Sequence, residues 1–222
     1  MTTLLIATRN AHKVGEIQAI LGTQFRCLTL KEFPDAPPVI EDVDTFAGNA
    51  TKKAVELAEW LTADNSKLKI KNLKPDFVLA DDSGLEVDEL NGAPGVHSAR
   101  FAALDSGADG NSSDAENNAK LLRVLGDVPL KKRTARFRCV IALAPAAGDG
   151  ATGLFDGACE GRISFTPSGA KGFGYDPLFV PEGLAQSFAE LGEEVKNRIS
   201  HRAHALEKLR AHFRGEAAWE TT

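Results

Sequence analysis

Residues 76–101 read Asp-Phe-Val-Leu-Ala-Asp-Asp-Ser-Gly-Leu-Glu-Val-Asp-Glu-Leu-Asn-Gly-Ala-Pro-Gly-Val-His-Ser-Ala-Arg-Phe. The apolar run from Phe77 to Ala80 predicts a short buried strand, and the carboxylates Asp81 and Asp82 follow it directly, before Ser83. In open α/β sheets, ligands bind beyond the carboxyl ends of the strands, because the following loops and helix N-termini converge there. We therefore expect both carboxylates at the carboxyl end of this strand, beside a ligand.

Two neighbouring carboxylates are suited to a divalent cation. Their charges repel unless a proton or a metal neutralises them, and a hard ion such as Mg²⁺ takes one or two carboxylates together with phosphate oxygens. The same residues are also typical of a solvated Asx turn that closes a strand. This stretch alone leaves both interpretations open.

Length and composition exclude several classes of protein. At 222 residues, 43% apolar and 26% charged, the chain is long enough for one large α/β domain or two small ones with a substantial core. A net charge of −5 argues against a nucleic-acid partner. Cys27, Cys139 and Cys159 form no CxxC pair, which indicates a reducing compartment and no zinc site. With no basic leader and no apolar run of about 18 residues, we expect a cytoplasmic protein without membrane contact.

The first strand–helix unit concentrates positive charge. Leu4 to Ala7 predicts a strand, and a helix follows from Ala11 to Leu21 with Asn10 as its N-cap. Arg9, His12 and Lys13 crowd its first turn, where the helix dipole disfavours cations. An anion would reverse that effect, so the pattern indicates a phosphate cradle. Two solvated basic side chains would give the same pattern.

A second helix follows an acidic segment. Phe25 to Thr29 predicts a strand, and Phe46 to Leu61 a helix capped by Asp44 or Thr45. Glu41 lies just before this helix and is either a second metal carboxylate or ordinary capping chemistry. The lysine-rich residues 62–75 indicate a solvated surface insertion more than a nucleic-acid patch.

The middle of the chain predicts a mixed sheet. Apolar and polar residues alternate from Leu85 to Leu90, which predicts a strand. Residues 104–114 predict a mobile loop, and residues 114–125 predict a helix that Gly126 ends. Lys132 to Leu143 and Gly153 to Phe165 predict an antiparallel pair. Without a repeat or a linker, we expect a single domain over residues 1–222.

Two later stretches indicate a ligand, one suited to a planar base and the other to an anion. Gly172-Phe173-Gly174-Tyr175 allows a close approach of the backbone to a planar base between two rings, although a hairpin with its rings on the core fits equally well. His201 and Arg202 open the last helix, which Ser200 caps. They repeat the dipole mismatch of the first helix, and such rule violations are expected at functional sites.

Six motifs follow one another along the chain: Ala7-Thr8-Arg9-Asn10-Ala11-His12-Lys13-Val14-Gly15-Glu16; Thr45-Phe46 with Asn49-Ala50 and Lys53-Ala54; Ala80-Asp81-Asp82-Ser83-Gly84-Leu85; Gly92-Ala93-Pro94-Gly95-Val96-His97-Ser98-Ala99-Arg100; Gly172-Phe173-Gly174-Tyr175-Asp176-Pro177; and Ser200-His201-Arg202. Together they resemble one family, the inosine triphosphate pyrophosphatases, also called noncanonical purine nucleoside triphosphate pyrophosphatases or XTP/dITP diphosphatases. Six motifs in the family's order are far more specific than any one of them.

The resemblance implies an α/β fold with an elongated mixed sheet flanked by helices, two lobes with the active cleft between them, and a homodimer. It also implies Mg²⁺-dependent hydrolysis of ITP, dITP and XTP to the monophosphate and pyrophosphate, which cleanses the nucleotide pool. By position, Asp82 is the catalytic acid or base, and Glu41 and Asp82 hold the metal. The implied substrate-binding residues are Thr8, Asn10 and Lys13 at the phosphates with Ser83 close by, Arg9, Ala11 and His12 beside them, and Phe173, Gly174, Tyr175, Asp176, Lys196, His201 and Arg202 around the base and sugar.

Base discrimination has a chemical reason. Hydrogen-bond donors from Arg202 or from loop N–H groups would meet the 6-keto oxygen of hypoxanthine or xanthine. Adenine presents a donor at that position and would leave buried groups unpaired. Guanine also carries a 6-keto group, and these residues give no reason for its rejection.

The chain departs from the family pattern in several places. The usual Glu-Thr-Gly is Glu41-Asp42-Val43 here, and the usual Glu before Asn-Ala is Gly48. Arg9 replaces a glycine often found in the first loop and adds charge beside the phosphates. The lysine-rich residues 62–75 resemble an insertion relative to compact members.

Two other functions compete with this interpretation. A nucleotide sensor would bind without turnover, but it has little use for a second carboxylate beside phosphates. A phosphatase would release only the terminal phosphate. We expect water to attack the α-phosphorus. For this reaction the protein mainly has to position the reactants and neutralise the phosphate charge.

Overall fold

The computed structural model describes residues 1–63, 74–105, 107, 110–148, 150–216 and 220–221. The chain forms two compact units. Unit 1 comprises Met1–Asp82, Cys139–Asp156 and Ala205–Thr222, and unit 2 comprises Ser83–Arg138 and Gly157–His204. The lysine-rich stretch predicted as an insertion lies mostly outside the described residues.

One sheet has the strand order β2-β1-β3-β4-β5-β6, and β7 pairs with β5. β1 runs parallel to β2 and to β3, whereas β5 runs antiparallel to β6 and β7. The predicted mixed α/β sheet is therefore confirmed. The strands are β1 (Thr3–Ile6), β2 (Arg26–Thr29), β3 (Phe77–Val87), β4 (Thr134–Pro145), β5 (Gly153–Ile163), β6 (Phe179–Pro181) and β7 (Glu220–Thr221).

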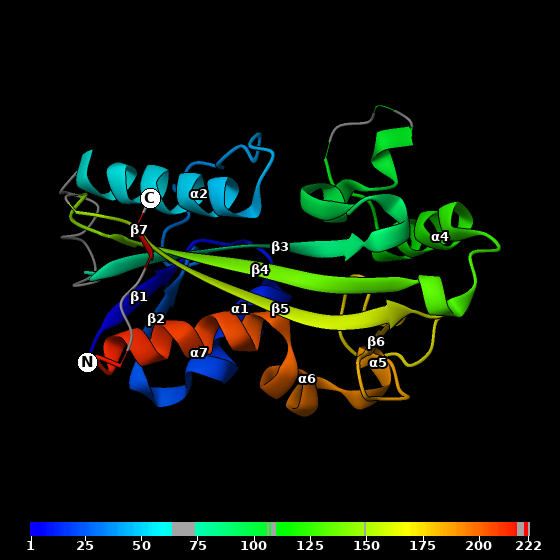
Figure 1. Ribbon diagram of the computed structural model, residues 1–222. Helices are drawn as coiled ribbons and strands as arrows, with labels where there is room; N and C mark the ends of the chain where they lie inside the picture. Colours follow the sequence, from blue (N-terminus) through cyan, green and yellow to red (C-terminus); the bar gives the residue numbers. More distant parts are fainter. Residues whose placement is uncertain (64–73, 106, 108–109, 149, 217–219, 222) are drawn as a thin grey trace. The chain divides into compact units, whose positions relative to one another are not determined.

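Three helices cover the unit 1 part of the sheet: α1 (Ala11–Leu21), α2 (Phe46–Ala63) and most of α7 (His201–Phe213). In Figure 1, α2 lies on one face of the strands and α1 and α7 lie on the other. α1 ends where predicted, because Gly22 adopts a φ of 61° that other residues rarely take. The short helix η1 (Gly22–Gln24) then leads into β2.

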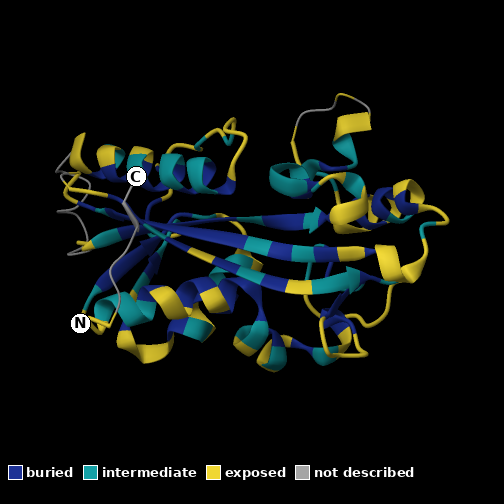
Figure 2. Cartoon of the chain, viewed as in Figure 1, coloured by how far each residue is buried: buried dark blue, intermediate teal, exposed yellow. Residues whose placement is uncertain are grey.

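The core of unit 1 forms where the apolar stripes of α1 and α7 meet the strands. Ile17 and Leu21 of α1 and Leu206 of α7 pack against Leu4 and Ile141. These side chains are at most 1% exposed, and burying each one contributes about 1.5–3 kcal/mol. In Figure 2, the unit 1 strands are mainly buried, and the outer sides of α1 and α7 are exposed.

Unit 2 has its own core, in which Leu121, Phe137, Tyr175, Phe179 and Phe188 are buried. α4 begins at a capping box in which Ser113 and Glu116 bond reciprocally to each other's backbone N–H groups. The unit 2 helices are η2 (Asp88–Leu90), η3 (Gly95–Arg100), η4 (Ala103–Asp105), α4 (Asp114–Leu125), η5 (Leu130–Lys132), α5 (Phe188–Leu191) and α6 (Glu193–Ile199).

β3 corrects the prediction that a short strand ends at Asp81. It continues through both aspartates and Gly84 to Val87, so that Asp81 and Asp82 lie in the middle of an 11-residue strand. β1 pairs with β3 only as far as Ile6 opposite Leu79, after which β3 keeps β4 as its neighbour. The carboxylates therefore lie just beyond the carboxyl end of β1, where the argument about ligand edges still applies.

Other boundaries also differ from the prediction. The predicted strand Leu85–Leu90 is wrong, because its first part belongs to β3 and Asp88–Leu90 forms η2. β4 begins at Thr134, since Lys132 closes η5, and β5 ends at Ile163. Part of the predicted loop 104–114 is helical, because η4 runs to Asp105.

Candidate functional site

The start of α1 in unit 1 is organised by Asn10. Its Oδ1 accepts hydrogen bonds from the backbone N–H groups of His12 at 2.9 Å and Lys13 at 3.2 Å. The Asn10 N–H in turn donates to Thr8 Oγ1 at 3.2 Å. The predicted N-cap is therefore confirmed, and it fixes the turn that the sequence assigns to the phosphates.

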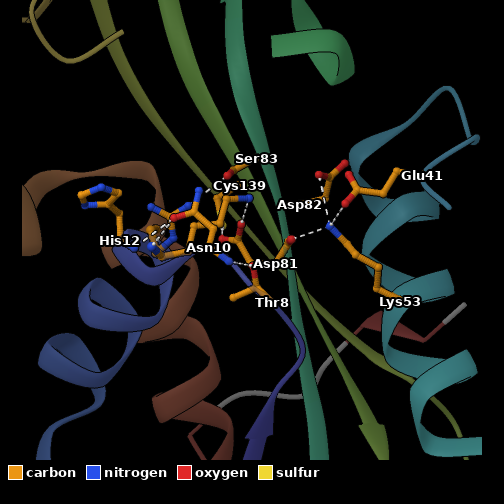
Figure 3. Close-up of polar contacts among 11 residues, drawn as sticks. Thr8, Asn10, His12, Glu41, Lys53, Asp81, Asp82, Ser83 and Cys139 are labelled. Atoms are coloured by element: carbon orange, nitrogen blue, oxygen red, sulfur yellow. Dashed lines mark hydrogen bonds and ion pairs between the residues drawn. The ribbon is translucent and has the colours of Figure 1, made fainter. Parts of the chain in front are cut away.

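Lys13 points from this turn to Asp81 on β3. Its Nζ lies 2.5 Å from Asp81 Oδ1, and the Asp81 side chain is 0% exposed. Cys139 of β4 donates its thiol hydrogen to Asp81 Oδ2 at 3.1 Å. Figure 3 shows Asp81 in the group formed by Thr8, Asn10 and Cys139. A buried carboxylate requires such partners, so Asp81 fixes the ammonium group of Lys13 beside the start of α1.

Lys53 of α2 contacts two carboxylate oxygens and one backbone oxygen in unit 1. Its Nζ donates to the backbone oxygen of Asp81 at 2.7 Å and lies 3.4 Å from Asp82 Oδ1 and 3.1 Å from Glu41 Oε1. Figure 3 shows Lys53 reaching from α2 toward Glu41 and Asp82. An ammonium group has three donors, and this arrangement uses all of them. The structure thus brings together Glu41 and Asp82, the two predicted metal ligands.

The titration of Asp82 is shifted by its surroundings. Burial raises the pKa of Asp82 to about 6, opposed by the charges of Lys53 and Lys13 and supported by those of Glu41 and Asp81. Its second oxygen, Oδ2, is buried without a hydrogen-bond partner among the described residues. A buried, unpartnered oxygen on a carboxylate with a raised pKa is typical of a proton acceptor or a cation ligand.

Arg9 contacts the proline-rich segment. Its Nη2 donates to the backbone oxygen of Ala36 at 2.6 Å, which attaches the first loop to the proline-rich segment. The guanidinium therefore has a structural contact of its own. Its predicted place beside the phosphates stays a prediction.

Two departures from the family pattern occupy the same space. A Cβ placed on Gly48 would overlap Val43 Cγ1 and would lie 2.9 Å from Thr45 Oγ1. Thr45 Oγ1 also accepts the Gly48 N–H at 3.0 Å, which caps α2 as predicted. Val43 thus fills space that a larger residue at position 48 would need. A pocket of about 470 Å³ on this side of α2 is lined by Ala47, Gly48, Thr51, Lys52, Val55, Glu56 and Glu59, and it contains none of the predicted site residues.

Unit 2 holds the residues predicted to surround the base. Lys196 Nζ lies 2.5 Å from Asp176 Oδ2 and 4.3 Å from the centre of the Phe173 ring. Asp176 Oδ2 also accepts the Phe173 N–H at 2.9 Å. Gly172 has a φ of 76°, and a Cβ there would overlap the Asp176 carboxylate. The glycine is therefore required for this close packing.

The start of α7 brings a second predicted group together. Ser200 Oγ accepts the Ala203 N–H at 3.2 Å, which confirms it as the N-cap. Arg202 Nη2 donates to Ser83 Oγ at 2.9 Å, and the His201 ring stacks on Phe137 with centroids 4.8 Å apart. His201 and Arg202 are 4% and 1% exposed. Both side chains are held in defined orientations.

Tyr175 is anchored rather than open to solvent. Its hydroxyl donates to the backbone oxygen of Ser98 at 2.8 Å, and burial raises its pKa. The ring belongs to the unit 2 core. The alternative that these aromatic rings fold onto the core is therefore correct for Tyr175.

From the sequence, no role was expected for Lys53 or Cys139, and Asp81 was expected to take part in a carboxylate pair rather than to hold Lys13. Lys53 carried the clearest signal, because it lies on the buried face of α2 among Ala50, Ala54 and Leu57. A lysine on an apolar helix stripe requires a buried anion. The contact of Cys139 has no comparable signal, since a cysteine in a buried strand is ordinary.

Among the described helices, none is long and apolar enough to cross a membrane. No group of three or more His, Cys, Asp or Glu side chains in the described part of the chain is placed to hold a metal ion.

Comparisons with known proteins agree with one another. A model of the Ham1 family matches residues 4–212. A dITP/XTP pyrophosphatase from Geobacter sulfurreducens is 47% identical, over 96% of this chain and 97% of that protein, and one from Shouchella clausii is 44% identical, over 97% and 98%. The structure of the Staphylococcus aureus Ham1 protein matches with a TM-score of 0.78 at 35% identity, over 97% of this chain and 100% of that one. The chain thus belongs to the Ham1 family.

Proposed function

We propose that the protein hydrolyses dITP and XTP, and by the same chemistry ITP, to the nucleoside monophosphate and pyrophosphate. The observation that carries the proposal is the arrangement around Lys53. One ammonium group bridges Glu41 and Asp82, while Asp82 Oδ2 is buried and no described residue forms a hydrogen bond with it. The relatives from Geobacter sulfurreducens and Shouchella clausii are named dITP/XTP pyrophosphatases, which supports the proposal.

The acidic pair fits Mg²⁺. Both side chains offer hard oxygen donors, and Mg²⁺ characteristically takes one or two carboxylates and completes its shell with water and phosphate oxygens. Two carboxylates without a third ligand suit that pattern better than a closed protein cage. Glu41 and Asp82 would hold the ion, which when bound would neutralise phosphate charge at the reacting centre.

The chain's own residues then divide the work. Asp82 Oδ2 would accept a proton from the attacking water, whose oxygen bonds to the α-phosphorus. The bond from the α-phosphorus to the oxygen that bridges the α- and β-phosphates breaks, and pyrophosphate leaves with that oxygen. Lys13, oriented by Asp81, would neutralise the polyphosphate, and the N–H groups at the start of α1 would add donors. Lys53 would keep Glu41 and Asp82 close despite their like charges.

Recognition of the base and sugar would fall to unit 2. Phe173 and the backbone of residues 173–176 would contact the base, and Lys196, His201 and Arg202 would add polar contacts whose orientations Asp176, Phe137 and Ser83 already fix. Such fixed side chains lose little entropy on binding.

Product analysis tests the proposal. Purified protein is incubated with dITP, XTP, dATP and dGTP, with Mg²⁺ and with a chelator, and the phosphorus products are identified by ³¹P NMR. We expect Mg²⁺-dependent pyrophosphate and monophosphate from dITP and XTP, with little reaction of dATP and dGTP. Binding without turnover would replace the enzyme by a sensor, and release of orthophosphate would indicate a phosphatase.

A further inference from the structure

α4 of unit 2 holds the backbone of Gly174 from two sides. Asp114 Oδ2 accepts the Gly174 N–H at 2.6 Å, and Asn118 Nδ2 donates to the Gly174 backbone oxygen at 2.9 Å. Both side chains come from the first turns of one helix, which its capping box anchors. Neither residue belongs to the set that the motifs assign to substrate, catalysis or metal.

These two bonds fix two different peptide groups. The Gly174 N–H belongs to the peptide with Phe173, whereas the Gly174 carbonyl belongs to the peptide with Tyr175. Gly174 has a φ of 61° and no side chain, so its flanking peptides would otherwise rotate easily. The Phe173 N–H is also engaged, since it donates to Asp176 Oδ2 at 2.9 Å.

The bond from Asn118 sets the direction of a donor. In a trans peptide the C=O and N–H groups point in opposite directions, and the only cis bond of the described chain is Ala93-Pro94. The Tyr175 N–H therefore points away from Asn118. No described residue accepts a hydrogen bond from this N–H, whereas the Tyr175 hydroxyl and ring are held by Ser98 and the core.

Asn118 is retained at a cost to stability. The residue is 8% exposed, and its Oδ1 is buried without a hydrogen-bond partner in the described part of the chain. A buried, unsatisfied amide oxygen destabilises the folded state, so an apolar residue of similar size would be favoured by stability alone. The bond to Gly174 gives a reason for the amide.

We propose that Asp114 and Asn118 are positioning residues for base discrimination, which lock the peptides around Gly174 so that the Tyr175 N–H is presented to the base as a donor. A donor complements the 6-keto oxygen of hypoxanthine and xanthine. A flipped peptide would present a carbonyl, which complements the 6-amino group of adenine. The inference rests on the proposed function, because it takes residues 173–176 as the base-contacting segment.

Substitutions on α4 test this role against a purely structural one. Asn118→Ala removes the donor, and Asp114→Ala removes the acceptor, whereas Asp114→Asn keeps an acceptor oxygen. The adjacent Asn117 provides the matched control, because it is also buried and its amide bonds the backbone of Ala99 and Ala102 instead of Gly174. Asn117→Ala should lower stability without changing base discrimination.

Two readouts are measured on each variant. Amide hydrogen exchange at Gly174 reports the clamp directly, and the ratio of kcat/KM for dITP over dATP reports discrimination. We expect Asp114→Ala and Asn118→Ala to speed exchange at Gly174 and to lower the ratio about tenfold, the factor that one lost hydrogen bond commonly represents. Most of the change should appear as a higher KM for dITP and a gain with dATP, and Asp114→Asn should largely restore both readouts.

Other results would overturn either the clamp on Gly174 or its role in base discrimination. Unchanged exchange in Asp114→Ala and Asn118→Ala would overturn the clamp, and faster exchange with an unchanged ratio would overturn the discrimination role. An equal fall of the ratio in Asn117→Ala would reduce the effect to general loosening of α4 and overturn the proposal. Wild-type protein inert toward dITP and XTP would overturn the proposed function and the discrimination role with it, while exchange at Gly174 would still decide whether the clamp exists.

Discussion

Lys53 is the residue on which the geometry of the acidic pair depends. It is 8% exposed, and it neutralises Glu41 and Asp82, which would otherwise repel each other. Replacing Lys53 by methionine keeps most of the length of the side chain and removes the charge. We expect this variant to lose about 2 kcal/mol in free energy of unfolding and at least about 100-fold in kcat.

Mg²⁺ should compensate for part of that loss. Without the ammonium group, the charges of the two carboxylates are not neutralised, so the variant should bind a cation more strongly than the wild type does. Mg²⁺ should therefore raise the Tm of Lys53→Met more than that of the wild type. Lys52→Met is the matched control, because Lys52 directly precedes Lys53 in α2 and pairs with the exposed Asp42. A Lys53→Met variant with wild-type activity and a wild-type response to Mg²⁺ would contradict this role.

Asp82 links the acidic pair to pH. Its pKa is about 6 in the folded protein and 3.8 as an isolated group. Between these values the folded state binds more protons than the unfolded state, so the wild type loses stability as pH rises from about 4 to about 6 and loses no more above that range. Asp82→Asn lacks this loss.

The stability difference between Asp82→Asn and the wild type should therefore grow in favour of the variant from about pH 4 to about pH 6 and then level off. Urea unfolding in the presence of a chelator measures it, and a difference independent of pH would show that Asp82 titrates normally. The same variant should lose at least about 100-fold in kcat at pH 8, since the proton acceptor is gone.

For single residues, the sequence predicted the metal-ligand candidates better than the residues that hold them in place. Glu41 and Asp82 were named from spacing and resemblance, and the structure places both within reach of one ammonium group. Their support by Lys53, and that of Lys13 by Asp81 and Cys139, depends on contacts between elements distant in sequence. Local patterns carry no information on such contacts.

Among the elements, the start of α2 illustrates a pair of linked substitutions. Gly48 leaves the space that Val43 Cγ1 fills, and the family pattern has a glycine at position 43 and a glutamate at position 48. Gly48→Glu alone should destabilise the protein by about 1–3 kcal/mol, because the new side chain overlaps Val43. Val43→Gly together with Gly48→Glu should be more stable than the sum of the single changes predicts.

A double-mutant cycle in urea measures the coupling between these positions. We expect a coupling energy of at least about 1 kcal/mol in favour of the double variant. Additive effects would mean that Val43 moves aside freely and that the two departures are independent.

Helices were predicted more accurately than strands. α1 and α4 begin and end where their capping residues and terminal glycines indicated, because those signals are local. The predicted strand is shorter than β3 because aspartate and glycine disfavour strands. In the structure, pairing across the sheet and burial of both aspartates override that preference. The pattern of apolar and polar residues does not predict that two charged side chains are buried inside a strand.

At the scale of the whole chain, the family and the mixed α/β sheet predicted from the motifs are confirmed. The homodimer and the cytoplasmic location stay predictions, and sedimentation at several protein concentrations tests the first of them. The predicted single domain likewise stays a prediction, beside the two compact units into which the chain divides.

The central claim is that water attacks the α-phosphorus with Asp82 as proton acceptor and pyrophosphate as leaving group. Hydrolysis of dITP in H₂¹⁸O with Mg²⁺, followed by mass spectrometry of both products, tests it most directly. We expect one ¹⁸O in the phosphate of dIMP and none in pyrophosphate. Label in pyrophosphate, or labelled orthophosphate as the product, would contradict it.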